Sequence, residues 1–374
     1  MMKTIKKILA TQLILTSVSL SISACSNTGK SHNSDEFVFK TDPPAKELTQ
    51  YNEVPDHLVL IYDGGMHRDI TWDKEHFAPY VSTEIEGQEQ WVFDGFLFLE
   101  IKDGQGRGFA SGYEQLPARK TEWEKLLNNY YTEGNAIHAL NAQIGLTRKE
   151  KKLPGEFKKR KVILGVPEPI PNQLDWGVAD GRSLHFTNTE DRLVAIKWYV
   201  DYAEELFQKG NFEHVELAGF YWLAEEATNS RDLARKVSDY IYSKKYDFYW
   251  IPYFNSDGYP EWEALGFNVT YYQPNYFFSE SVPYERLQEA YNRAEKLRMN
   301  LEVEFDERAL KNNMDWGYRL TDYLDVFEQN GAFDSLKIAY YQGGDAFYQL
   351  SISKEPADIK LHQRLIQIIM RSKK

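Results

Sequence analysis

Eight short apolar runs recur along the chain after residue 54, and helix-like stretches separate most of them. The runs cover residues 57–62, 92–99, 161–167, 214–222, 246–253, 267–273, 300–305 and 336–341. Each run has the length and the aromatic and β-branched composition of a strand. Because helices connect successive strands, the strands are expected to be parallel and joined by right-handed crossovers. Eight such units predict an α/β fold, a (β/α)8 TIM-type barrel.

The helices are predicted from apolar residues at helical spacing and from signals at the helix ends. They are expected at residues 121–131, 135–152, 189–209, 231–244, 260–265, 284–298, 316–329 and 356–371. The alternative fold is an open doubly wound sheet, which usually carries a glycine-rich phosphate turn after its first strand. Residues 62–65 read Tyr-Asp-Gly-Gly and lack that spacing, so the barrel is favoured.

The first 24 residues have the layout of a secretory signal peptide. Three lysines within the first seven residues precede an uncharged, mostly apolar stretch, which Ser and Thr interrupt too often for a good membrane span. Small residues then lead into Cys25, and this pattern resembles a lipobox. We expect an exported lipoprotein, anchored to a bacterial membrane by acyl chains on Cys25. The alternative is an ordinary signal peptide with a stray thiol near its cleavage site.

The rest of the chain divides into a tether and one large domain. Residues 25–52 are polar and predict a flexible lipidated tether, and residues 53–374 are expected to form the barrel. Cys25 is the only cysteine, which excludes disulfides, a thiolate metal site and, once acylated, a cysteine nucleophile.

The net charge and the motif content exclude several classes of function. The formal charge is −12, and removal of the three signal-peptide lysines takes it to −15, which argues against nucleic acid as a partner. The chain has no HExxH, Walker or GxSxG motif. His67 with Asp63 and Asp69 could bind a metal, but their spacing is loose. We therefore expect no metal and no cofactor.

The seventh run carries three acids on one face of the strand. Side chains alternate along a strand, so Glu302, Glu304 and Asp306 should all point into the barrel. Burying three acids is costly unless they are paired or protonated, and a purely structural strand would avoid it. The alternative is a strand end on the solvent rim, or acids paired with Arg298 or Arg308.

Two further acids, Glu225 and Glu226, follow the fourth run, although they could also open the next helix. Carboxylates after strand four and on strand seven are typical of many barrel glycosidases. One carboxyl protonates the leaving oxygen, and the other attacks the anomeric carbon or activates water. We predict Glu225 as general acid/base and Glu304 as nucleophile. The alternates are Glu302, Asp306 and Glu226.

Aromatic and polar residues at the strand ends are expected to bind the sugar, by stacking and by hydrogen bonds to hydroxyls. Singly, each aromatic is more often core than binding surface, but their grouping at one end of the barrel favours binding. The predicted set is Tyr62, Asp63, Glu168, Tyr221, Trp222, Trp250, Tyr253, Asn255, Gln273, Asn275, Tyr276, Tyr341 and Gln342.

Several of these segments resemble one bacterial family. The motif WIPYF at 250–254 and the motif QPNYF at 273–277 are the most specific, and GFYW at 219–222 and EVEFD at 302–306 support them. Over roughly residues 55–349 the chain resembles domain-of-unknown-function family 4855. That family looks like a relative of barrel glycosidases, and the resemblance implies no particular substrate.

The sequence therefore predicts a glycoside hydrolase-like lipoprotein that cleaves an extracellular oligo- or polysaccharide by a two-carboxylate, retaining mechanism. We expect a monomer that touches the membrane through its lipid anchor only. The alternative is a non-catalytic surface lipoprotein that binds glycans on a barrel scaffold. Two carboxylates facing one cleft would favour the enzyme, whereas acids paired with arginines would favour the binding protein.

Overall fold

The computed structural model describes residues 49–371, and within them eight parallel strands close into a barrel. The predicted TIM-type (β/α)8 fold is confirmed. Around the ring the order is β1-β14-β13-β12-β11-β10-β7-β4. The strands are β1 (His57–Tyr62), β4 (Gly95–Leu99), β7 (Arg160–Val166), β10 (Val215–Trp222), β11 (Asp247–Trp250), β12 (Val269–Tyr272), β13 (Asn300–Glu304) and β14 (Ile338–Tyr341). The predicted signal peptide, Cys25 and most of the predicted tether lie outside the described residues.

The strands read as continuous apolar runs because both of their faces are buried. Every residue of β1, β4, β11 and β12 is buried, as expected where the interior of the barrel lies on one side and helices on the other. Strand β1 pairs with β14 in parallel, with His57 opposite Ile338. This pairing of the first and last strands closes the barrel and leaves it no sheet edge.

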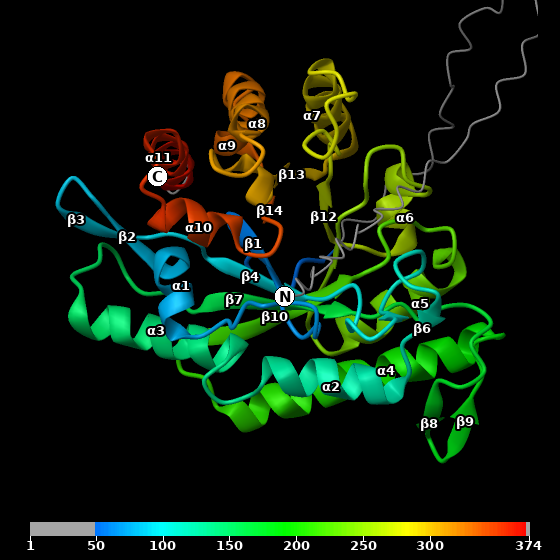
Figure 1. The fold of residues 1–374 in the computed structure, drawn as a ribbon. Coiled ribbons are helices and arrows are strands. Elements are labelled where there is room, and N and C mark those ends of the chain that lie inside the picture. Colours follow the sequence, from blue (N-terminus) through cyan, green and yellow to red (C-terminus); the bar gives the residue numbers. More distant parts are fainter. Residues whose placement is uncertain (1–48, 372–374) are drawn as a thin grey trace, which may run out of the picture. The chain divides into compact units, whose positions relative to one another are not determined.

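Helices surround the strands (Figure 1). They are α1 (Lys74–Val81), α2 (Lys120–Tyr130), α3 (Ala136–Glu150), α4 (Thr189–Gly210), α5 (Arg231–Ser243), α6 (Trp262–Leu265), α7 (Glu285–Leu297), α8 (Gly317–Gln329), α9 (Ala332–Ser335), α10 (Ala346–Ile352) and α11 (Pro356–Arg371), with 3-10 turns η1 (Tyr259–Glu261) and η2 (Glu307–Ala309). Each predicted helix is present within a few residues, whereas α1, α9 and α10 were not predicted. Between residues 49 and 371, no helix is long and apolar enough to cross a membrane.

Three small sheets lie outside the barrel and were also not predicted. Antiparallel hairpins join β2 (Ser82–Ile85) to β3 (Gln88–Trp91) and β8 (Gly177–Ala179) to β9 (Arg182–Leu184). In the loop after β4, β5 (Arg107–Gly108) pairs with β6 (Leu116–Pro117). This last pair shapes a loop that carries one wall of the candidate site.

The described chain begins at the amino ends of the barrel strands. The backbone N–H groups of Tyr51 and Asn52 donate to the two carboxylate oxygens of Asp247, the first residue of β11, at 2.9 and 2.8 Å. The Asn268 amide, just before β12, donates to the carbonyl oxygen of Thr49 at 3.0 Å. The chain therefore enters the barrel at the end opposite the carboxyl ends of the strands.

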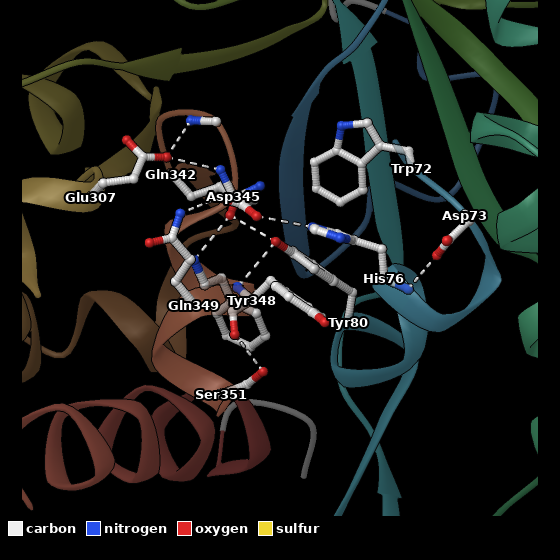
Figure 2. A network of polar contacts seen from close by, with 12 residues as sticks. Trp72, Asp73, His76, Tyr80, Glu307, Gln342, Asp345, Tyr348, Gln349 and Ser351 are labelled. Carbon is white, nitrogen blue, oxygen red and sulfur yellow. Dashed lines mark hydrogen bonds and ion pairs between the residues drawn. The ribbon is translucent and has the colours of Figure 1, made fainter. Parts of the chain in front are cut away.

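A polar network joins α1 to α10, where the first and last units of the barrel meet (Figure 2). The Tyr80 hydroxyl donates to Gln342 at 2.9 Å and accepts the backbone N–H of Tyr348 at 3.2 Å. His76 Nε2 lies 3.2 Å from an oxygen of Asp345, and its ring stacks on Tyr348 with 3.9 Å between centroids. We call these five residues the seam network, since they tie the two ends of the barrel domain together.

Candidate active site

Two of the three predicted acids of β13 are buried inside the barrel without a basic partner. Glu302 is 0% exposed and Glu304 is 1% exposed, and both belong to the strand's inward face. Neither oxygen of Glu302 has a hydrogen-bond partner of good geometry. No ion pair among the described residues includes either acid. The strand pattern thus correctly located two buried acids.

Glu304 is held in place by donors from two neighbouring elements. Its Oε2 accepts the Tyr323 hydroxyl from α8 at 2.5 Å and the backbone N–H of Asn275 from the loop after β12 at 2.7 Å. Burial raises the pKa of Glu304, and these donors oppose the rise because they stabilise the charged form. The arrangement fixes the orientation of the carboxylate, as a nucleophile requires.

Glu225 reaches the same region from the end of β10. A β-bulge between Leu217 and Gly219 shifts the register of β10 against β7, and bulges re-aim the side chains that follow. Gly219 is needed there, because a Cβ atom would lie 2.5 Å from the carbonyl oxygen of Asp247. Glu225 Oε1 then accepts the Gln273 amide at 3.2 Å. Burial raises the pKa of Glu225 to about 7.

The three glutamates form one electrostatic cluster, which we call the acid cluster: Glu225, Glu302 and Glu304. Burial raises the pKa of Glu302 well above its usual range, and the charges of Glu304 and Glu225 raise it further. The charge of Glu225 also raises the pKa of Glu304. The Gln273 amide opposes this rise, although neither oxygen of Glu302 has a hydrogen-bond partner of good geometry.

A cavity of about 260 Å³ opens beside Glu225. Four predicted residues line it, namely Glu168, Glu225, Glu226 and Tyr253. The Tyr253 hydroxyl donates to Glu226 at 2.7 Å. The structure therefore brings together acids that follow β7 and β10 and a tyrosine that follows β11.

Three predicted tyrosines face the acid cluster from the barrel strands. Tyr62 and Tyr341, on β1 and β14, contact each other edge to face with 5.7 Å between ring centroids. The charge of Glu225 acts on Tyr62 and Tyr221, and the charge of Glu302 acts on Tyr221 and Tyr341. These rings therefore surround the acid cluster inside the barrel.

Two predicted acids are already satisfied within the protein. Asp306 pairs with Arg308 at 2.6 Å and also caps η2, as the alternative interpretation of this strand anticipated. Asp63 accepts the side-chain amides of Asn129 at 2.6 Å and Asn135 at 3.1 Å. Burial nevertheless raises the pKa of Asp63 to about 6. Both acids anchor loops at the mouth of the barrel.

Three residues predicted to bind substrate are enclosed by the protein instead. Trp222 and Trp250 are fully buried on the outer faces of β10 and β11, and their indole N–H groups donate to Ser230 and to the carbonyl oxygen of Ala224. Tyr221 faces inward, so Trp222 must face outward. Gln342 belongs to the seam network, and its amide donates to the Leu60 carbonyl at 3.2 Å.

The loops after β11 and β12 hold the remaining predicted residues, which mainly contact neighbouring helices. The Asn255 side chain accepts a hydrogen bond from Arg293 of α7 at 2.6 Å. The Tyr276 hydroxyl donates to Asp322 of α8 at 2.5 Å. The backbone N–H of Asn275 donates to Glu304, and the side-chain amide of Gln273 donates to Glu225.

Sequence reasoning missed four residues that shape the site. The Tyr113 hydroxyl, from the β5–β6 loop, hydrogen-bonds to Glu225, and Tyr323 holds Glu304 from the middle of a helix. Glu100, directly after β4, pairs with Arg68 at 2.6 Å, and Arg68 lies over the Tyr62 ring. Glu100 could have been found, since it is an acid at the end of a strand. The contacts of Tyr113 and Tyr323 leave no local signal in the sequence.

No group of three or more His, Cys, Asp or Glu side chains within residues 49–371 is arranged to hold a metal ion. Of the acid cluster, Glu225 lines the cavity, whereas Glu302 and Glu304 lie buried inside the barrel.

The chain belongs to the family described as domain of unknown function DUF4855, whose model matches residues 57–367. This confirms the resemblance seen in the sequence motifs. A search of curated proteins finds no match.

Solved structures that resemble the chain share the barrel at low sequence identity. A candidate α-L-fucosidase from Bacteroides thetaiotaomicron is 11% identical, with 91% of this chain and 99% of that chain covered and a TM-score of 0.42. A GH113 β-1,4-mannanase is also 11% identical, with 84% and 99% covered and a TM-score of 0.42. The xylanase and α-amylase inhibitor protein XAIP-II from Scadoxus multiflorus is 14% identical, with 83% and 97% covered and a TM-score of 0.41. The activities named in this comparison are those of the matched proteins.

Proposed function

We propose that this protein is a glycoside hydrolase that cleaves an extracellular oligo- or polysaccharide, with Glu225 as general acid/base and Glu304 as nucleophile. The observation that carries the proposal is the acid cluster itself. The charges of the three carboxyls act on one another inside the barrel, none of the three is in an ion pair, and burial raises the pKa of Glu225, which lines the cavity, to about 7. A structural role would have left these acids paired.

The two catalytic roles follow from the different surroundings of the two side chains. Glu225 borders the cavity and its raised pKa keeps it protonated near neutral pH, so it can protonate a leaving oxygen. Glu304 is oriented by the Tyr323 hydroxyl and the Asn275 N–H. Burial raises its pKa as it raises that of Glu225, and these two donors oppose the rise, so the assignment of Glu304 as nucleophile rests on its fixed orientation. After the glycosyl group transfers to Glu304, Glu225 as a base takes a proton from the water that releases it.

We further propose that the domain is exported and held at a bacterial membrane by acylated Cys25, which keeps the cleft near extracellular glycans. Replacement of Cys25 by Ala should release the protein from membranes into the soluble fraction. Membrane fractionation and labelling with a radioactive or clickable fatty acid measure this directly. Persistent membrane association of Cys25→Ala would contradict the anchor.

The test of the activity is hydrolysis of a polysaccharide panel by the wild type and by Glu225→Gln. We expect the variant to lose about 100- to 10,000-fold in kcat on whichever glycan is cleaved, with an unchanged fold. The wild-type rate should fall as the pH rises above about 7, because Glu225 then loses its proton. Proton NMR of the first product should show the retained anomeric configuration. Glycan binding without cleavage would instead support a surface binding protein.

A further inference from the structure

The cavity beside Glu225 is acidic, and none of the residues that line it is basic. Its lining includes three carboxyls, Glu168, Glu225 and Glu226, and the rings of Tyr113 and Tyr253. Besides these acids the lining offers the side chains of Ser111 and Asn229, which can also meet a sugar, so the carboxylates of Glu168 and Glu226 distinguish this wall from one that binds only neutral groups. Such a wall suits a ligand that brings positive charge and several donors.

Glu168 supplies an independent sign of a missing ligand. Its side chain is 3% exposed, and its Oε2 accepts the backbone N–H of Ser111 at 2.7 Å. Its other oxygen, Oε1, is buried and has no hydrogen-bond partner among the described residues. A buried acceptor of a carboxylate is costly to leave unsatisfied. The cost is removed when a bound donor occupies the cavity.

The nearest basic group does not neutralise this carboxylate directly. The charge of Arg192 acts on Glu168, but its guanidinium donates to the carbonyl oxygens of Pro169 and Asn229, both at 2.7 Å. No metal-binding group of three acids or histidines occurs within residues 49–371. The lining therefore suits an organic cation that brings N–H donors of its own.

We propose that this cavity binds the ammonium group of an amino sugar, so that the preferred glycan carries free rather than acetylated amino groups. The inference rests on the proposed glycosidase function for its choice of ligand class. An ammonium group offers three N–H donors, which match Glu168 Oε1 and the carboxylate of Glu226. The rings of Tyr113 and Tyr253 add cation–π attraction. N-acetylation would remove the charge and add bulk.

The first experiment measures binding to the full chain at pH 6 by isothermal titration. The probes are D-glucosamine and D-galactosamine, their N-acetyl forms and the parent hexoses, each with and without EDTA. We expect the wild type to prefer the amino sugars in both conditions. Glu168→Gln keeps the acceptor for Ser111 but loses the charge, and it should weaken amino-sugar binding about 10- to 100-fold. Equal affinity for acetylated, neutral and amino sugars, or a preference abolished by EDTA, would overturn the inference.

Two further variants keep the result interpretable. Glu226→Gln changes a half-buried residue at the cavity wall, so it should fold even if Glu168→Gln does not, and it should also weaken the amino-sugar preference. Glu133→Gln removes an exposed acid outside the cavity and should leave the preference unchanged. A preference that survives both Glu168→Gln and Glu226→Gln would count against the cavity.

Hydrolysis assays distinguish a failure of the amino-sugar site from a failure of the proposed glycosidase function. Polymers of hexosamine are offered in de-N-acetylated and fully acetylated forms, beside neutral polysaccharides. Cleavage of neutral or acetylated polymers alone would support the glycosidase and overturn the amino-sugar site. Selective binding of amino sugars without cleavage of any polymer would support the site and overturn the glycosidase.

Discussion

The seam network and the acid cluster are both groups of polar side chains inside one domain, but they differ in how the oxygens of their acids are hydrogen-bonded. In the seam network, Asp345 lies in ion-pair contact with His76 on one oxygen and accepts the Gln349 amide at 2.6 Å on the other. In the acid cluster, both oxygens of Glu302 lack a partner of good geometry. The acid of the seam network thus has a contact on each oxygen, although His76 Nε2 makes no hydrogen bond of good geometry, whereas both oxygens of Glu302 lack such a bond.

This difference separates a structural polar cluster from one kept for a ligand. Fully partnered buried groups rigidify a fold, and an unpartnered buried acid costs stability. The same chain satisfies Glu307 with the backbone N–H groups of Gly344 and Asp345, so it can supply donors at the barrel mouth. Glu302 and Glu168 each keep a buried oxygen without a donor of good geometry, and substitutions in the two regions can test whether this serves function.

The largest expected effect is on activity, and it should be confined to the acid cluster. Glu304→Gln keeps an acceptor for the Tyr323 hydroxyl but removes the nucleophilic charge, so kcat should fall by about 1,000-fold or more. The matched change in the seam network, Asp345→Asn, should alter kcat less than about threefold. Steady-state kinetics on the substrate found in the panel measure both. Comparable losses of kcat in the two variants would show that the acid cluster matters no more for activity than the seam network does.

The second effect is a loss of stability that follows a change in the seam network. Gln342→Leu would leave the Tyr80 hydroxyl, the Leu60 carbonyl and the Phe347 N–H without their partner. We expect the free energy of unfolding to fall by roughly 3 kcal/mol, since each buried unpaired group costs about 1–3 kcal/mol. Urea titration followed by circular dichroism measures the loss. An unchanged unfolding midpoint would show that these bonds contribute little.

The third prediction concerns the slope of the free energy of unfolding against pH. Here a substitution in the acid cluster should gain stability at higher pH instead of losing it. The folded-state pKa of Glu302 lies well above its ordinary value of 4.5, so the folded protein binds more protons than the unfolded chain above about pH 4.5. The stability that Glu302 contributes is thus complete below that pH and is lost as the pH rises towards the folded pKa. Glu302→Gln should remove a decline of about 1.4 kcal/mol per pH unit. If the free energies of unfolding of wild type and variant changed with pH in parallel, Glu302 would not hold a proton in the folded protein.

The sequence predicts the barrel well because its strands are buried on both faces and read as separate apolar runs. It fails where the chain departs from that repeat. Helix α1 holds Pro79, which weakens the helical pattern, and the strands of β2–β3 and β8–β9 are too short and too exposed to show an apolar run. Local patterns therefore recover the repeating units and miss the insertions between them.

For the site, alternation along β13 predicts Glu302 and Glu304, because a run of inward acids is unusual enough to notice. The same alternation, applied to β10 from Tyr221, would have placed Trp222 outside. The roles of Tyr113 and Tyr323 could not be predicted, since Tyr323 lies 19 positions from Glu304 and Tyr113 more than 100 positions from Glu225 in the sequence, in a helix and a loop that carry no acid-binding pattern. Sequence identifies the acids but not the groups that orient them.

The entry of the chain beneath β11 has a consequence for access. Backbone N–H groups of Tyr51 and Asn52 grip Asp247 at the amino end of the barrel, while the acid cluster lies at the carboxyl end. With Cys25 acylated as proposed, the barrel would be joined to its anchor at the amino ends of its strands, which is the end opposite the acid cluster.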